Sequence, residues 1–274
     1  GMLHLLGYDH EGDAQQAATQ SVTINFRGQV GDAEFDCNTA YDDLGTTDAT
    51  ATLTDFRLYV HDVRLVDAQN VEVPVVLTQD GLWQYQDLVL LDFEDDTGAC
   101  ANGTPQMNAA VVGEVPEGNY VGLRFRLGVP QALNHLDASA GDTPSPLNLT
   151  AMFWTWTTGY KFLRVDSAPV GAGPFNLHVG ATGCTGDPAL GENVTCTNRN
   201  VAEVRFDAFD AATDTIVVDY AAAVAESDLL VNAAGAPGCM SGVTDPECAP
   251  IFPRLGVDLA TGDPLATQSL FRLE

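Results

Sequence analysis

Alternation of apolar and polar residues is the dominant pattern along the chain. Apolar side chains recur at every second position, a spacing that places them on one face of an extended strand. The clearest runs span residues 22–26, 56–61, 121–127, 204–206 and 216–220. No stretch keeps a helical period over three turns, and residues 221–230 are the best candidate for a helix. The pattern therefore predicts a chain built almost entirely of strands.

Turn-forming residues gather between the predicted strands. Eight of the 14 Pro and ten of the 26 Gly lie in four segments, which are residues 138–146, 168–174, 180–191 and 233–250. Such segments are typical of surface loops rather than of linkers between domains. Because half-polar strands need one buried face each, we expect an all-β fold, an antiparallel Greek-key-like β-sandwich with long loops. We predict that residues 19–274 form this single domain and that residues 1–18 are a tail.

Six cysteines lie among the loop-forming residues. They are Cys37, Cys100, Cys184, Cys196, Cys239 and Cys248. No two of them form a CxxC pair, and zinc ribbons need tighter spacing. An even number of cysteines in loops predicts disulfides, and hence a periplasmic or secreted protein. The simplest of the fifteen pairings joins the two close pairs, 184–196 and 239–248, and leaves Cys37 for Cys100.

Acidic residues outnumber basic ones, 38 against 11, and give a net charge of -27. Such a charge repels phosphate backbones and anionic lipids, so we expect neither nucleic acid nor membrane surfaces as partners. It favours cationic partners, including metal ions, although a solvated acidic surface explains the charge equally well. No apolar run is long enough to span a membrane. We find no signal peptide, so the leader of an exported protein would lie outside this sequence.

The first ten residues, GMLHLLGYDH, resemble the metal-binding stretch of YbeY-type endoribonucleases, which reads H-G-x-L-H-L-x-G-Y-D-H. His4 and His10 would be two of the metal ligands. The first histidine of that motif and the small domain that precedes it are absent here. Two histidines without a third ligand do not make a catalytic zinc site. We therefore interpret residues 1–18 as a fusion remnant, a cloning scar or a chance match, and endoribonuclease activity as the weakest hypothesis.

Five stretches of the chain resemble, in order, the MbnP family, the four-cysteine member of a "metallo-mystery pair". They are FRLYVHDVRLVD (56–67), LWQYQDLVLLDFED (82–95), GLRFRLGVPQALNH (122–135), PLNLTAMFWTWTTGYKFLRVD (146–166) and FNLHVGATGC (175–184). The FWTWTTGYKFLR block is the most specific, and the segment with Cys239, Met240 and Cys248 also fits. This resemblance implies a copper-binding protein whose ligands are histidines and a kynurenine. It also implies a partner, a di-haem peroxidase-like cytochrome of the MbnH type, which makes the kynurenine from a tryptophan.

Two histidines are the candidate copper ligands. His135 follows a tight GVP turn in a loop, and His178 alternates with Leu177 and Val179, so it points away from their apolar face. Both lie inside the resembling stretches. His61 lies on the polar face of a strand, where it could be an ordinary surface residue. A lone histidine is more often a solvated or hydrogen-bonded residue than a ligand, and the family context is what favours His135 and His178.

A thioether and three tryptophans complete the candidate site. Two imidazoles suit copper, and the soft sulfur of Met152 would favour Cu(I). If residues 152–156 are extended, Met152, Trp154 and Trp156 share one face, although such a face is also typical of ordinary core. We expect the modified tryptophan to be Trp154 or Trp156, with Trp83 as the third candidate. Met240 is a weaker ligand candidate.

Other functions find less support in the residues. The sequence has neither a Gly-rich phosphate loop nor a GxSxG elbow, so we do not expect an enzyme. Asp92, Glu94, Asp95 and Asp96 could bind calcium, but they lack EF-hand spacing and are typical of a solvated turn. The main alternative to a copper protein is a structural or adhesive β-sandwich that binds a protein or a glycan without metal.

Overall fold

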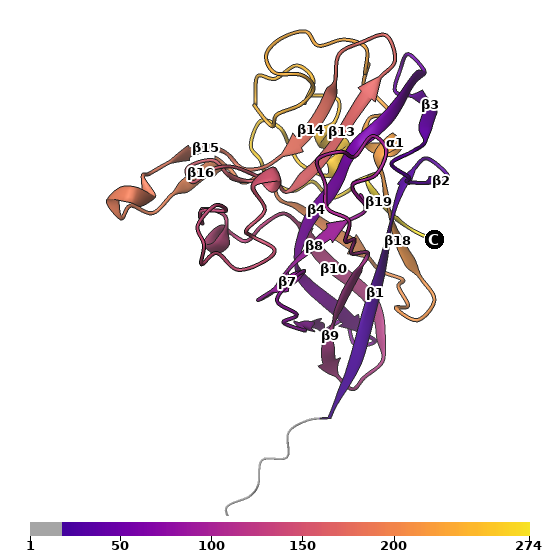
Figure 1. Cartoon of the computed structure of the whole chain (residues 1–274). Helices are drawn as coiled ribbons and strands as arrows, with labels where there is room; N and C mark the ends of the chain where they lie inside the picture. The colour runs from indigo at the N-terminus through magenta and orange to yellow at the C-terminus, as the bar shows by residue number, and fades with distance from the viewer. Residues whose placement is uncertain (1–17) are drawn as a thin grey trace, which may run out of the picture.

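Two β-sheets form the framework of the computed structural model, which describes residues 18–274 (Figure 1). The first sheet has the strand order β19-β18-β1-β9-β6, with β2 also paired to β1. Its strands are β1 (Thr19–Val30), β2 (Ala33–Glu34), β6 (Val76–Leu77), β9 (Ala110–Pro116), β18 (Thr215–Asp219) and β19 (Phe271–Leu273). The predicted tail lies outside the described residues except for Ala18, and so do His4 and His10.

The second sheet is organised around β4, a strand of 19 residues. Its main path is β14-β13-β4-β10-β17, and β3, β5 and β8 also pair with β4, while β7 pairs with β8. The strands are β3 (Ala40–Leu44), β4 (Ala49–Asp67), β5 (Glu72–Pro74), β7 (Gln84–Tyr85), β8 (Leu88–Asp92), β10 (Tyr120–Leu127), β13 (Leu163–Pro169), β14 (Phe175–Val179) and β17 (Ala202–Phe206). The described fold is all-β and antiparallel apart from β1–β18, which confirms the predicted class.

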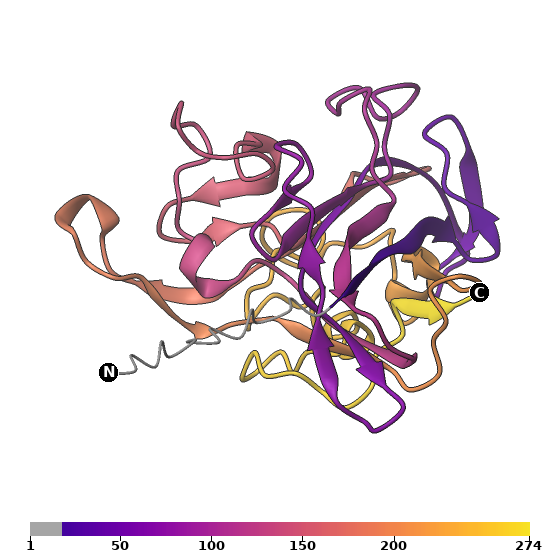
Figure 2. The same cartoon turned by 90° about the horizontal axis from the view of Figure 1, so that it is seen from below.

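Two small hairpins and a few short helical turns lie outside these sheets. The hairpins are β11 (Phe153–Thr155) with β12 (Gly159–Tyr160), and β15 (Thr182–Thr185) with β16 (Thr195–Asn198). The helical turns are η1 (Gln131–Leu133), η2 (Thr150–Met152), η3 (Pro188–Leu190), α1 (Tyr220–Ala223) and α2 (Phe252–Leu255). Hairpin β15–β16 extends away from the two sheets in both views (Figure 1, Figure 2).

The helix expected over residues 221–230 is a single turn, α1. The Asp219 carboxylate caps its start by accepting N–H bonds from Ala221 and Ala222. The chain then leaves the helical path, because the Ser227 N–H donates to Val224 O and the Ser227 carbonyl accepts from Thr46. A local turn and a tertiary hydrogen bond from Thr46 therefore end the helix after one turn.

Strand β1 joins distant parts of the chain. It runs antiparallel to β9 on one side and parallel to β18 on the other. The Gly31 N–H beyond its end donates to the Asp219 carboxylate at 2.8 Å, across 188 positions of sequence. The first strand of the fold is therefore held by residues near the end of the chain.

The main apolar core lies between the two sheets and follows the predicted alternation. Ile24 and Phe26 of β1 face it from one sheet, and Phe56, Leu58 and Phe125 face it from the other. Phe26 packs against Phe125 edge to face, with ring centroids 5.7 Å apart. The core thus confirms the predicted sandwich.

The expectation of one buried face per strand is wrong at the middle of the second sheet. All five residues of β8 are buried, and Tyr59 of β4 belongs to a second apolar cluster that also contains Leu88, Leu90 and Tyr160. The Tyr59 and Tyr160 rings meet edge to face at 5.9 Å. The β11–β12 hairpin and its neighbouring loops cover the outer face of the sheet, so this face is interior as well.

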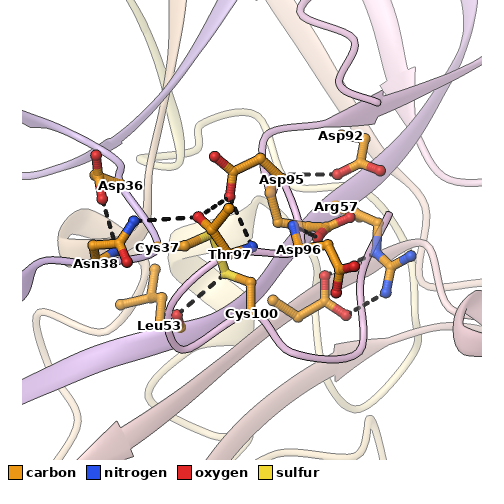
Figure 3. Close-up of a disulfide and its surroundings, with 12 residues drawn as sticks. Asp36, Cys37, Asn38, Leu53, Arg57, Asp92, Asp95, Asp96, Thr97 and Cys100 are labelled. Carbon is orange, nitrogen blue, oxygen red and sulfur yellow. Dashed lines mark hydrogen bonds and ion pairs between the residues drawn. A yellow bond between two sulfur atoms is a disulfide. The ribbon is translucent and has the colours of Figure 1, made fainter. Parts of the chain in front are cut away.

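The three disulfides are those of the simplest predicted pairing: Cys37–Cys100, Cys184–Cys196 and Cys239–Cys248. Figure 3 shows the first of them, which joins the segment after β2 to the loop that follows β8. Among the described residues, no helix is long and apolar enough to cross a membrane.

The acidic loop beside this disulfide is not the solvated turn that its sequence predicts. Asp92 and Glu94 are fully buried, whereas Asp96 is exposed. The backbone N–H groups of Asp96 and Thr104 donate to the Glu94 carboxylate at 3.0 Å. A Cβ atom at Gly103 would overlap that carboxylate, so the loop closes tightly around it. Figure 3 shows Asp92 and Arg57 in this region.

Candidate metal centre

His135 is held by the β11–β12 hairpin. It follows η1, and the preceding residue, Asn134, accepts a hydrogen bond from the Tyr160 N–H at 2.9 Å. The Nδ1 atom of His135 lies 2.7 Å from the Trp156 carbonyl oxygen. Because a carbonyl only accepts, Nδ1 carries the proton and Nε2 keeps its lone pair. Burial lowers the pKa of His135, opposed in part by this hydrogen bond, and so favours the neutral imidazole.

The free Nε2 atom of His135 faces a disulfide. It lies 3.6 Å from the Cys196 sulfur. The candidate ligand atoms of His135, Cys184 and Cys196 all lie within 4.8 Å of one another, and all three residues are half-buried. A surface cavity of about 410 Å³ opens beside them, with His135 and Thr195 in its wall. This position of His135 was not expected from the sequence.

His178 lies on the outer face of β14, opposite Arg164 of β13. Its side chain points away from the main core, as predicted, yet it is buried. Its Nε2 atom lies 2.6 Å from the Asp166 carboxylate. Burial would raise the pKa of Asp166, but hydrogen bonds from His178 and Arg164 and the positive charge of Arg164 lower it below its ordinary value. A carboxylate on one ring nitrogen orients the other toward a ligand.

His61, like His178, is a buried histidine of the second sheet. The sequence allowed an ordinary surface residue, but His61 is buried, because β8 pairs with this part of β4 and the outer layer covers it. Its Nδ1 atom lies 2.7 Å from the Gly128 carbonyl. Burial lowers the pKa of His61, opposed by that hydrogen bond. The apolar run of β8 was the sequence signal for a covered outer face.

The β11–β12 hairpin presents two of the three tryptophans to a shared space. Phe153, Trp154 and Trp156 line an open surface cavity of about 530 Å³, together with Asp137. Trp156 is 40% exposed. The pKa of Asp137 is lowered, first by its hydrogen bonds with Ser139 and also by one from the Trp156 side chain. The indoles are therefore accessible from the surface.

Trp154 connects this hairpin to β14. Its ring lies directly over Gly180, two residues beyond His178, so that a Cβ atom at position 180 would be 2.5 Å from the ring. The hairpin thus touches both candidate ligand segments, through Trp156 at His135 and through Trp154 beside His178. No contact joins the two histidines directly among the described residues.

The predicted common face of Met152, Trp154 and Trp156 is wrong. Met152 ends the helical turn η2, and the extended backbone begins only at Phe153. The Met152 side chain is fully buried in the second apolar cluster with Leu133 and Tyr160. The turn at 150–152 rotates Met152 into the interior.

Trp83 and Met240 lie in other surroundings. Trp83 packs on the second apolar cluster and lines a separate cavity of about 180 Å³ with Pro146 and Leu149. Met240 follows Cys239, and its N–H donates to the Asp245 carboxylate at 3.0 Å. Among the described residues, the two groups of three His, Cys, Asp or Glu ligands both contain a disulfide: one includes His135, and the other is Cys239, Asp245 and Cys248.

We expect Gly180→Ala to displace Trp154, because the new methyl group would meet both the indole and the Tyr160 carbonyl. The substitution should destabilise the protein by about 1–3 kcal/mol, as overpacking of a tight interior does. Urea denaturation and tryptophan emission measure the two effects. Gly141→Ala is the control, since nothing lies within 4 Å of a Cβ at that position. Equal stability and emission in the two variants would contradict the packing described here.

Comparison with known proteins identifies similar molecules. A protein-family model described as MbnP matches residues 19–241. Among solved structures, MbnP from Methylosinus trichosporium is similar with a TM-score of 0.87 and 35% sequence identity, covering 93% of this chain and 98% of that chain. No curated protein sequence matches the chain.

Proposed function

Since the chain belongs to the MbnP family, we propose that it is a copper-binding protein, not an enzyme, that holds the ion with His135, His178 and the β11–β12 hairpin. The observation that carries this proposal is that an oxygen atom holds one ring nitrogen of each imidazole. Each has one ring nitrogen on an oxygen, the Trp156 carbonyl for His135 and the Asp166 carboxylate for His178. This arrangement fixes the tautomer and is typical of metal-bound histidines.

The hairpin supports the same proposal through its tryptophans. A tryptophan that a di-haem cytochrome oxidises to kynurenine must be near the surface and near the metal. Trp156 is exposed and its carbonyl binds His135, and Trp154 lies beside the strand that carries His178. We propose one of these two as the modified residue, ahead of Trp83. Met152 stays a candidate donor, from the buried cluster beneath the hairpin.

Charge and covalent structure support the proposed setting. A net charge of -27 draws cations toward the surface. Three disulfides are typical of an oxidising compartment, so we propose the periplasm or the exterior of the cell. Two imidazoles bind copper in either oxidation state, and a thioether would favour Cu(I). Acquisition or handling of copper is the role that these features support.

Copper binding by the two histidines is testable with protein purified from its native host. His135→Ala and His178→Ala should each weaken copper affinity by more than about 100-fold, since even the hydrogen-bond partners of metal ligands contribute 10–100-fold. Competition with a chromophoric Cu(I) chelator measures the affinity. Peptide mass spectrometry of the same samples should find a kynurenine in the peptide that contains Trp154 and Trp156.

His61→Asn is the matched control for these variants. His61 is also buried with one ring nitrogen on a carbonyl, but it lies outside the proposed ligand set. We expect its copper affinity to stay within about threefold of the wild type, a range of less than 1 kcal/mol. Unchanged affinity in a His135→Ala/His178→Ala double variant that remains folded would end the proposal.

A binding module without metal is the second candidate function. The observation that favours it is the open cavity of about 530 Å³ lined by Phe153, Trp154 and Trp156, because exposed aromatic side chains are common at recognition surfaces. Native protein that contains no copper and three unmodified tryptophans would support this function over copper binding.

A further inference from the structure

The disulfide that faces His135 has the atoms of a second metal site. Cys184 and Cys196 are directly opposite each other in the β15–β16 hairpin. Their sulfurs and a nitrogen of His135 lie within 4.8 Å of one another. Hydrogen bonding of Nδ1 to Trp156 leaves Nε2 as the nitrogen that faces the sulfurs. Two sulfurs and one imidazole nitrogen are a donor set for a soft cation once the sulfurs are thiolates.

This disulfide is also the one that a reductant can reach. Cys184 and Cys196 are half-buried on a hairpin that extends away from the sheets (Figure 2). The other four cysteines are at most 3% exposed. The surface cavity of about 410 Å³ is lined by His135 and by Thr195, the residue that precedes Cys196. Thiol–disulfide exchange depends on access to a sulfur, so reduction should begin here.

We infer that reduction of the Cys184–Cys196 disulfide opens a second copper site, in which the two thiolates and the Nε2 atom of His135 bind one Cu(I) ion. The disulfide state would then decide between two uses of His135. With the disulfide closed, the imidazole serves the site of the proposed function. With the disulfide open, it completes a sulfur-rich site that favours the reduced ion.

The redox step requires an external dithiol, such as a thioredoxin-class protein or dithiothreitol. One thiolate of the dithiol attacks a sulfur of the Cys184–Cys196 bond, which breaks and releases the other sulfur as a thiolate. The second thiol of the reductant resolves the mixed disulfide and leaves the reductant oxidised. Two electrons and two protons pass to Cys184 and Cys196, and the protons leave when the thiolates bind the cation.

This second site rests on the proposed function only because both sites bind copper and both use His135. Variants therefore distinguish the failure of one from the failure of the other. The full chain is reduced under mild anaerobic conditions, desalted and tested by thiol counting and by competition with a chromophoric Cu(I) chelator. We expect two thiols per chain and a gain in Cu(I) affinity of at least about tenfold over the oxidised protein, from the preference of Cu(I) for thiolates. The gain should survive in His178→Ala, which loses only the binding of the oxidised form.

The gain in Cu(I) affinity should be absent from the Cys184→Ser/Cys196→Ser variant. It should also be absent from His135→Ala, which retains the disulfide and provides the test if the serine variant does not fold. Three results would overturn the inference. The first is the release of four or six thiols together on reduction. The second is Cu(I) binding by the reduced wild type that is no tighter than that of the oxidised protein. The third is a gain in Cu(I) affinity that persists in the Cys184→Ser/Cys196→Ser variant. The copper affinity of the oxidised His178→Ala variant tests only the proposed function, because the thiolate site does not use His178.

Discussion

Replacement of Arg57 by methionine should lower the free energy of unfolding by about 3–5 kcal/mol, the cost of removing one partner of a buried ion pair. The Arg57 side chain is only 2% exposed, and its guanidinium binds Asp55 through two hydrogen bonds of 2.8 and 2.6 Å. Burial alone would lower the pKa of Arg57, but Asp55, Asp92 and Glu94 raise it above its ordinary value. Methionine keeps the apolar stem and removes the charge, and urea denaturation measures the loss.

Arg205→Met is the matched control for this substitution. Arg205 also lies on a strand of the second sheet and pairs with an acid two residues away, Asp207 at 3.0 Å. Its side chain is 63% exposed, and exposed ion pairs contribute about 0–1 kcal/mol. Equal losses in the two variants would show that burial does not decide the contribution of Arg57.

Asp92→Asn should remove a large part of the dependence of stability on pH. Burial, together with the charge and hydrogen bonding of Glu94, raises the pKa of Asp92 from 3.8 to about 9. The folded protein then keeps a proton that the unfolded chain loses. Stability from this group is complete below the unfolded pKa, near 4, and is lost as the pH rises toward 9. The loss cannot exceed about 1.4 kcal/mol per pH unit, the value for one proton.

Asparagine imitates the protonated carboxyl and has no proton to lose. Its amide can donate to Glu94, and its oxygen can accept the Glu94 N–H that Asp92 now accepts at 3.1 Å. Unfolding free energies measured at several pH values should therefore fall less steeply for Asp92→Asn than for the wild type. Asp96→Asn should follow the wild-type curve, since Asp96 is exposed on the same loop. Parallel curves for all three proteins would show that Asp92 is ionised in the folded state.

Much of the fold could be predicted because strand alternation is a local property. Residues 22–26 and 121–127 show the alternation of buried and exposed faces in the sequence itself. Two disulfides join cysteines that are close along the chain, and the third joins the two that remain. The outer layer over the second sheet could not be predicted in the same way. The apolar run of β8 indicates that both faces of the strand are covered, but it does not indicate which segments cover them. The burial of His61, Asp92 and Glu94 follows from that cover.

The assignment of His135 and His178 as copper ligands stays a prediction. The chain context favoured His135 and His178, and each proved to have a fixed ring nitrogen. The proximity of His135 to the Cys184–Cys196 disulfide depends on how a hairpin folds back over a loop, which residue spacing does not report. Met152 was placed wrongly because one helical turn reverses its direction. Such turns depend on tertiary contacts more than on local sequence.

The parallel pairing of β1 with β18 has a consequence for the timing of folding. Until the ribosome has supplied β18, one edge of β1 has no partner from that end of the chain, and an open edge is a template for association with other molecules. Contacts across 188 positions also close slowly, because a long loop must be ordered first. An unfolded chain therefore keeps this open edge until β18 docks on β1.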